Sequence, residues 1–169
     1  KIFLAAPLSL KEIEEHFRDQ IELRDGVFWD SRAKAVSAAK SRRLGALVLE
    51  EKPSTNADPT LIAEAMTDGV RDMGLAALPW TDGARILRAR VMFLRRLFPD
   101  AGWPDLSDDA LLAALDDWLT PYLAGISRKA HLERLDMHQI IQAMIPHDLA
   151  RGMDRLAPVR IEVPSGADV

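Results

Sequence analysis

Five aspartates lie close together between positions 105 and 117, and they are the first side chains in this sequence that could carry chemistry: Asp105, Asp108, Asp109, Asp116 and Asp117. Grouped carboxylates can hold a divalent cation or transfer protons. Asp108 and Asp109, however, directly follow Ser107 at the start of a predicted helix, where the positive end of the helix dipole favours negative charge. The other three have no histidine or metal-ligand spacing around them. The cluster therefore predicts a helix start and no metal site.

The other residue types that catalyse reactions or bind metals form no recognisable site either. The histidines share no helix face at ligand spacing, and the absence of cysteine excludes a thiol nucleophile, a cysteine metal site and a disulfide framework. The sequence has no GxxxxGK[ST] loop, no GxGxxG after a strand, no HExxH and no GxSxG. We therefore expect no catalytic residue, metal or cofactor in this chain.

Basic side chains concentrate in two places. One cluster lies in a stretch without any acid between Ser31 and Leu49, and the other covers one side of a predicted helix at 81–98. Two interpretations stay open for each cluster. The first cluster either protects an edge strand from aggregation or contacts phosphate groups. The arginines of the helix either contact phosphate groups as well, or pair with the acids of 103–123 or dock against domains outside this chain. The candidate nucleic-acid-binding residues are Lys40, Arg42, Arg43, Arg85, Arg88, Arg95 and Arg96.

One arginine of the same helix, Arg90, falls on the opposite side from these four. At about 100° per residue it lies near the middle of the predicted apolar arc. An unpaired guanidinium is costly there, so Arg90 needs a carboxylate partner. We predict a buried ion pair with Asp116 or Asp117, and Asp105 is the next candidate. The arc consists of Ile86, Leu87, Phe93, Leu94, Leu97 and Phe98.

The elements that must position these side chains begin with a small β-rich part. A Ser9–Glu12 capping box predicts a short helix that buries Leu10, Ile13 and Phe17. Alternating apolar residues then predict an antiparallel sheet of three or four strands up to residue 50. We place turns at Asp25-Gly26 and at 30–32, and a bulge or a close backbone approach at Gly45.

A mainly helical part follows a Pro- and Ser-containing linker at 52–57. Asp58, Thr81 and Ser107 are suitable N-caps for three helices, and the last two helices are expected to pack on each other. Trp103, Trp118 and Tyr122 are predicted core residues, because apolar side chains at this spacing share one helix face. The predicted fold is α+β, with a small antiparallel β subdomain at 1–53, a helical subdomain at 58–156 and a terminal strand within 157–169.

The composition sets limits on the function. The net charge of −4 provides no global attraction to nucleic acid or membrane, so such a contact requires locally segregated charge. No apolar run has the length of a membrane span, and the absence of cysteine fits a reducing cytoplasm. The chain starts inside an apparent strand and stops after a turn, so we expect it to be part of a larger protein.

Seven segments occur in an order that resembles one family. They are IFLAAPL at 2–8, VFWD at 27–30, RRLGALVLEEKP at 42–53, LPW at 78–80, LRARVMFLRRL at 87–97, WPDLSDDALLAALDDWLTPYLAG at 103–125 and LAPVRIEVPSG at 156–166. Together they span nearly the whole chain, and the sixth is long enough to be specific. The sequence resembles the HrpB-type bacterial ATP-dependent RNA helicases of the DEAH-box group, in the region that follows their motor domains.

The resemblance implies an accessory C-terminal region without catalysis of its own. The Walker lysine, the DEAH box and the arginine fingers belong to motor domains that are missing here, so ATP and Mg²⁺ are implied only for the parent protein, a cytoplasmic hydrolase. The implied partners are the motor domains of the same chain and single-stranded RNA. The alternative is a protein-interaction or structural module that braces the helicase core without touching nucleic acid.

We expect the isolated chain to hydrolyse no ATP and to unwind no duplex, because every phosphate-binding motif is absent from it. A phosphate-release assay on rigorously purified protein checks this expectation. Hydrolysis above a buffer blank that persists through purification contradicts it.

Overall fold

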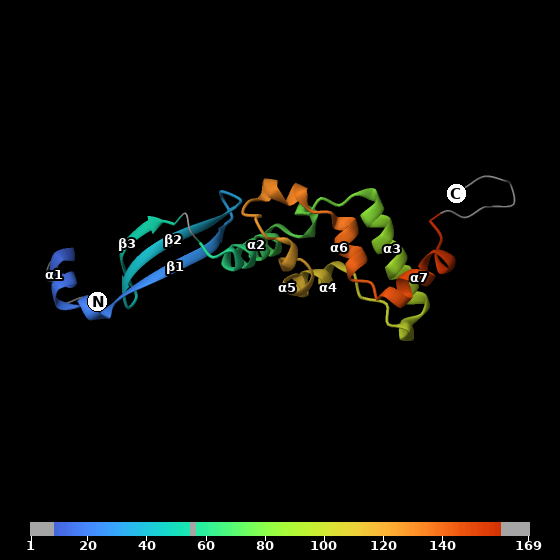
Figure 1. The fold of residues 1–169 in the computed structure, drawn as a ribbon, viewed down its shortest axis with the longest axis horizontal. Coiled ribbons are helices and arrows are strands. Elements are labelled where there is room, and N and C mark those ends of the chain that lie inside the picture. Colours follow the sequence, from blue (N-terminus) through green and yellow to red (C-terminus); the bar gives the residue numbers. More distant parts are fainter. Residues whose placement is uncertain (1–8, 55–56, 160–169) are drawn as a thin grey trace, which may run out of the picture.

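The structure is a computed structural model that describes residues 9–54 and 57–159. Its parts follow one another along an elongated molecule: a short helix α1 (Leu10–His16), a three-stranded sheet and a helical body (Figure 1). The predicted α+β class is confirmed, with α1 and the sheet preceding the helical body. The subdomain boundaries stay predictions, and the expected terminal strand lies beyond the described residues except for Val159, which is not in a strand.

The sheet is antiparallel with the order β1-β2-β3. Its strands are β1 (Ile21–Asp30), β2 (Ala35–Leu44) and β3 (Leu47–Pro53). β1 and β2 pair in unbroken register from Ile21↔Leu44 to Asp30↔Ala35. Residues directly opposite each other share one face of a sheet, so this register determines which side chains lie together.

One predicted turn, at Asp25-Gly26, and one predicted bulge, at Gly45, are corrected by the strand pairing. Asp25 and Gly26 lie inside β1, opposite Lys40 and Ala39, because continuous pairing with β2 overrides the local turn preference. Gly45 lies in the β2–β3 turn with a φ of 57°, and the irregularity in the ladder falls between Arg42 and Arg43. The turn predicted at 30–32 is confirmed, since the Asp30 carboxylate accepts hydrogen bonds from the following backbone amides.

The sheet is attached to the helical body at its β1–β2 end. The indole of Trp29 lies against Gly69 of helix α2 (Pro59–Met73), where a Cβ would approach its ring to 2.6 Å. Trp29 Nε1 donates to Asp72 Oδ2 at 3.1 Å. Beside it, Val36 N donates to Ser127 O and Lys129 N to Lys34 O, at 2.7 and 2.9 Å. An aromatic contact and backbone hydrogen bonds therefore fix the orientation of this end of the sheet.

The helical body begins with the expected caps. Asp58, Thr81 and Ser107 each accept a hydrogen bond from a first-turn amide, and Pro59 occupies the first turn of α2. These caps satisfy backbone donors that a helix start leaves unpaired. The remaining α-helices are α3 (Asp82–Leu97), α4 (Asp108–Ala113), α5 (Leu115–Trp118), α6 (Met137–Ala143) and α7 (His147–Leu156), joined by turns and 3₁₀ segments.

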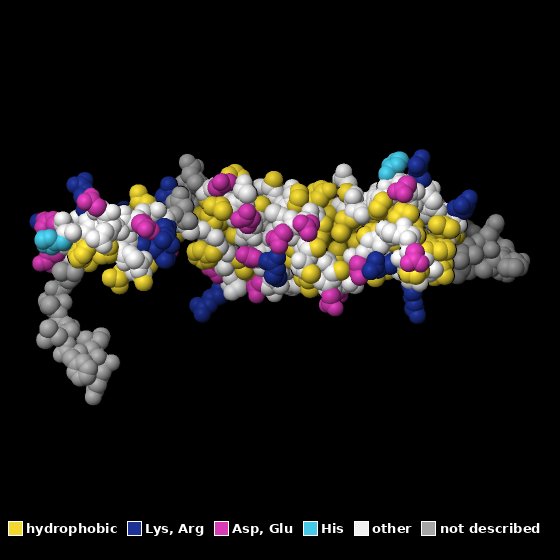
Figure 2. All heavy atoms as spheres, turned by 90° about the horizontal axis from the view of Figure 1, so that it is seen from below, with side chains coloured by type: hydrophobic (Ala, Val, Ile, Leu, Met, Phe, Trp, Pro, Cys, Tyr) yellow, Lys and Arg dark blue, Asp and Glu magenta, His cyan; other side chains and the backbone are white. Residues whose placement is uncertain are grey.

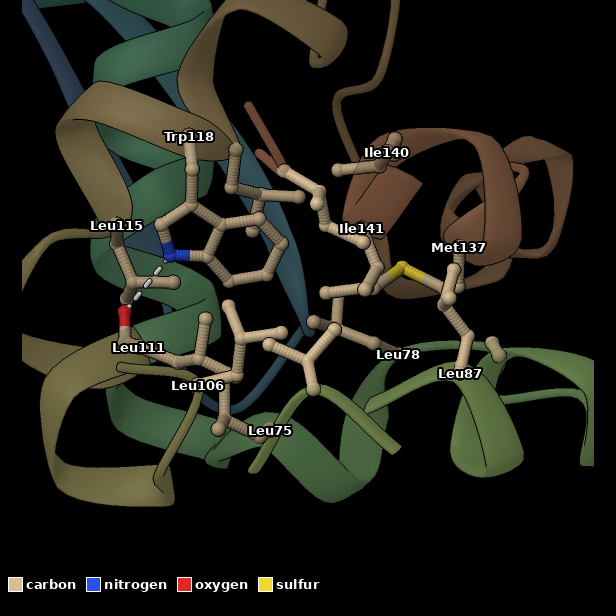
Figure 3. Close-up of a cluster of buried hydrophobic side chains, with 14 of the residues drawn as sticks. Leu75, Leu78, Leu87, Leu106, Leu111, Leu115, Trp118, Met137, Ile140 and Ile141 are labelled. Atoms are coloured by element: carbon tan, nitrogen blue, oxygen red, sulfur yellow. Dashed lines mark hydrogen bonds between the residues drawn. The ribbon is translucent and has the colours of Figure 1, made fainter. Parts of the chain in front are cut away.

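The core of the body surrounds Trp118 (Figure 3). Its indole is buried and donates through Nε1 to Leu111 O at 2.8 Å, and Trp103 is also buried. Tyr122 is 42% exposed, so its predicted place in the core is wrong. The predicted helix breaks at Ala114 and continues past Pro121 as a 3₁₀ turn, which rotates Tyr122 away from the face of Trp118.

Two other predicted apolar faces are also corrected. α3 buries Ala84, Leu87, Val91 and Leu94 and packs chiefly on α6, not on the helices at 108–118. The buried face is thus rotated away from the predicted arc. In α1 the capping box between Ser9 and Glu12 is confirmed, but this helix buries none of its residues.

Replacing Trp118 by alanine should lower the free energy of unfolding by about 3–5 kcal/mol, because it removes a buried indole and leaves a cavity. Tyr122→Ala is the matched control and should cost about 1 kcal/mol or less, because that ring is half exposed. Urea denaturation followed by circular dichroism measures both. Equal losses for the two variants would contradict the assignment of Trp118 to the core.

Candidate nucleic-acid interface

The three basic residues of β2 do not form one strip. Side chains alternate between the faces of a strand, so Lys40 and Arg42 share one face and Arg43 lies on the other. Arg43 Nε donates to Ser41 Oγ at 3.2 Å on its own face. The basic side chains of β2 therefore lie on both faces of the sheet, although their neighbouring sequence positions had suggested one continuous strip.

Arg42 is held by carboxylates from two other elements. Its Nη1 lies 2.6 Å from Glu14 Oε1 of α1 and 3.6 Å from Glu50 Oε2 of β3. The hydrogen bond with Glu14 is the main cause that raises the pKa of Arg42, whereas the hydrogen bond with Lys52 is the main cause that lowers the pKa of Glu50. These ion pairs connect α1 to the sheet. They also neutralise the positive charge of Arg42 that would otherwise attract a phosphate group.

Arg88 of α3 is likewise committed within the molecule. Its Nε donates to Leu106 O at 2.6 Å, its Nη2 pairs with Asp108, and its guanidinium lies 5.4 Å from the centre of the Trp80 ring. Trp80 is itself held by a hydrogen bond from Nε1 to Leu75 O. Arg88 thus joins three segments of the body.

Arg95, two turns further along α3, repeats the arrangement. Its Nη1 donates to Trp103 O at 2.9 Å and its Nη2 lies 3.2 Å from Asp105 Oδ2. The pKa of Asp105 is lowered, first by the backbone amide of Ser107 and to a lesser extent by Arg95. Asp105 therefore contributes both to the turn before α4 and to the ion pair with Arg95.

Arg90 is shielded as predicted but has a different partner. Its side chain is 13% exposed, and it donates to Ala157 O at 2.6 Å and pairs with Asp154 of α7. The predicted partners Asp116 and Asp117 are wrong: Asp116 pairs with Arg71 of α2, and Asp117 is exposed. The sequence contains no signal that α7 lies along this side of α3.

Arg85 and Arg96 complete the candidate set. Both are exposed, and neither makes an ion pair or hydrogen bond with the residues that the structure describes. They are eleven positions apart in one helix, which places them on the same side and about 16 Å from each other. They are therefore the two arginines of α3 whose charge is available to a partner.

The seven candidates therefore do not form one basic surface. The β2 residues belong to the sheet and the α3 residues to the helical body. On the face seen in Figure 2, basic side chains occur singly or in small groups among acidic ones. Within 9–54 and 57–159 no cluster of histidine and acidic residues could hold a metal ion, and no helix there is long and apolar enough to cross a membrane.

Removing Arg90 should destabilise the protein more than removing its acidic partner. Arg90→Ala leaves Ala157 O without its donor and should cost about 1–3 kcal/mol. Asp154→Ala should cost about 1 kcal/mol or less, because the Asp154 side chain is 87% exposed and its charge is screened. Chemical denaturation of both variants tests the order, and a larger loss for Asp154→Ala would contradict it.

Comparisons with known proteins point to one helicase family. Residues 118–169 match the family described as ATP-dependent helicase C-terminal, and residues 20–54 match the connector region of the ATP-dependent RNA helicase HrpB. The ATP-dependent RNA helicase HrpB of Escherichia coli K12 is 28% identical over the whole chain, which spans 21% of the length of that relative.

Two solved structures are similar as well. The crystal structure of the E. coli DExH-box NTPase HrpB is 29% identical with a TM-score of 0.64, and the match covers 99% of this chain and 21% of that one. The E. coli DEAH/RHA helicase HrpB structure gives the same identity and TM-score over 89% of this chain and 19% of that one. The two family matches and the match along the whole chain identify this protein as a C-terminal region of the HrpB-type ATP-dependent helicase family.

Proposed function

We propose that this chain is a non-catalytic accessory region that braces a longer helicase, with its sheet as a rigid spacer between the helical body and the preceding parts. One observation carries the proposal: the sheet is fixed to the body at one end and exposes apolar side chains at the other. ATP hydrolysis, Mg²⁺ binding and a cytoplasmic location belong, in this proposal, to the longer protein.

The contacts at the attached end support the spacer role of the sheet. They restrict rotation of the sheet relative to the helical body as well as its separation from the body. The Trp29 indole is held by Gly69 on one side and by the Asp72 carboxylate at its nitrogen. The backbone hydrogen bonds of Val36 and Lys129 lie beside it. A hinge would need a segment with fewer such contacts.

The opposite end of the sheet supports docking. Leu23 is 79% exposed and Leu47 is 61% exposed. Leu47 pairs with Leu44, which pairs with Ile21, so these apolar side chains share a face. They lie near α1, beside an open hollow of about 720 Å³ that Leu23, Ile21 and Arg42 help to line. Adjacent exposed apolar side chains often mark a protein contact, and the connector match covers this sheet.

Nucleic-acid contact is the second candidate, and the exposed guanidinium groups of Arg85 and Arg96 are the observation that favours it. Arginine can bind phosphate through paired donors. Arg42, Arg88 and Arg95 are engaged with carboxylates, however, so fewer positive charges remain for an RNA strand than the sequence suggests. Bracing therefore has the stronger support.

Hydrogen exchange in the full-length helicase that carries this region tests the docking. Leu23→Glu should speed amide exchange at the Ile21 end of β1 and the Leu47 end of β3, because it places a charge in the proposed contact. Val159→Glu is the control, since it places the same charge on another exposed apolar side chain outside the sheet. Identical exchange in both variants would show that this end of the sheet is not docked.

The attachment of the sheet gives a separate prediction. Gly69→Ala should lower the free energy of unfolding by about 1–3 kcal/mol, because its Cβ would overlap the Trp29 ring. Gly152→Ala in α7 meets no atom within 4 Å and should instead stabilise by about 0.5–1 kcal/mol through helix propensity. In a protein that already carries Trp29→Ala, Gly69→Ala should bring no such penalty, because the ring that its Cβ would overlap is gone. Similar effects at the two glycines would contradict the close contact.

A further inference from the structure

The outer face of α3 has no partner among the described residues. We use this name for Ile86, Ala89, Phe93 and Leu97, which follow one another at spacings of three, four and four residues and so form one stripe along the helix. All four are exposed, and the Phe93 side chain is 55% exposed. The stripe lies about 120° around the helix from the buried face that contains Leu87, Val91 and Leu94. α3 is therefore apolar on two separate sides, and only one of them is covered by the described residues.

Two hollows run beside this stripe, both on the side that carries Arg85 and Arg96. The first holds about 520 Å³ and is lined in part by Trp80, Ala89 and Met92. The second holds about 270 Å³ and lies between Met92, Arg96 and Pro99. Open apolar hollows of this size can accept side chains from a helix that lies along α3.

The charges that border the stripe define the chemistry of its partner. Arg88, Arg90 and Arg95 are each paired with a carboxylate, which leaves Arg85 and Arg96 as the arginines of α3 whose charge is unopposed within the described chain. They lie about 16 Å apart along the helix. A partner that covers the stripe would need acidic groups at a similar separation.

We propose that the outer face of α3 is a docking surface for an acidic amphipathic helix of a partner protein. Apolar side chains of that helix, at positions i, i+3 or i+4 and i+7, would cover Ile86, Phe93 and Leu97. Carboxylates on its flanks would pair with Arg85 and Arg96. The site is independent of the proposed bracing contact, because α3 lies on the far side of the body from the sheet (Figure 1).

Two other occupants fit the surface less well. A second copy of this chain, packed antiparallel through α3, would bring Arg85 of one copy close to Arg96 of the other and so oppose like charges. An RNA strand would meet two available guanidinium groups and one exposed aromatic ring, whereas Ile86 and Leu97 offer no ring on which a base could stack. An acidic helix matches both the stripe and the charges.

The probe is a synthetic amphipathic helix of about 20 residues with leucine at the a and d positions of its heptads and glutamate beside them. Its fluorescence anisotropy is followed as full-length helicase is added.

Phe93→Ala should weaken binding by about tenfold or more, as expected for an aromatic residue at the centre of an interface. The Arg85→Glu, Arg96→Glu double variant should weaken it similarly and should improve binding of a matched peptide with lysine in place of glutamate. Arg151→Glu, an exposed change on α7, is the control and should have little effect.

Four results would overturn the proposal. The first is equal binding of the glutamate and lysine peptides, or no loss with Phe93→Ala. The second is displacement of the peptide by a single-stranded oligouridine of about 20 nucleotides, which would make the surface an RNA site. The third is a dimer in sedimentation velocity that Phe93→Ala abolishes. The fourth is protection of a Phe93→Cys thiol from maleimide in the full-length protein without peptide, which would show that the same chain covers α3.

Amide hydrogen exchange at the free end of the sheet should be unchanged in the Phe93 and Arg85/Arg96 variants. That result distinguishes this site from the proposed bracing contact.

Discussion

Backbone carbonyl groups outside helices and strands still need hydrogen-bond donors, and three arginines of α3 supply them to the irregular segments of the helical body. Arg88 donates to Leu106 O, Arg95 to Trp103 O and Arg90 to Ala157 O. Each guanidinium also pairs with a carboxylate close to the carbonyl that it binds. A planar group with five N–H donors can serve both acceptors together, which a lysine ammonium does less well. The segment at 103–108 and the C-terminal end of α7 are thereby fixed to α3.

This use of arginine changes the interpretation of positive charge in the chain. A density of basic residues in sequence is typical of phosphate binding, but the charge of a guanidinium paired with a carboxylate is already compensated, and two of its five N–H donors are in use. The charge of α3 is therefore mainly structural on the sides that face its neighbours. Of the charge on α3, only that of the exposed Arg85 and Arg96 is available to another molecule.

Local features were predictable from the sequence, and features that depend on distant segments were not. The caps at Ser9, Asp58 and Ser107 are confirmed, because a cap depends on residues within one turn. Asp25-Gly26 has the composition of a turn but lies in a strand, since pairing with β2 decides its conformation. The partner of Arg90 could not be predicted, because apolar periodicity does not show which helices become neighbours. The same limit applies to the candidate interface, whose residues adjacent in β2 lie on opposite faces.

The Arg90 contacts also affect the order in which the protein can assemble during synthesis. The acceptors of Arg90 follow it by 64 and 67 residues, whereas β1 and β2 are joined by a short turn. On the ribosome the sheet can form while the body is still being translated, since domains fold in the order in which they emerge. α3 emerges long before α7, so Arg90 must stay hydrated until the segment at 154–157 has left the exit tunnel. The last turn of α7 thus completes the helical body, and a pause in translation before it would prolong the time during which the body is open to chaperones and proteases.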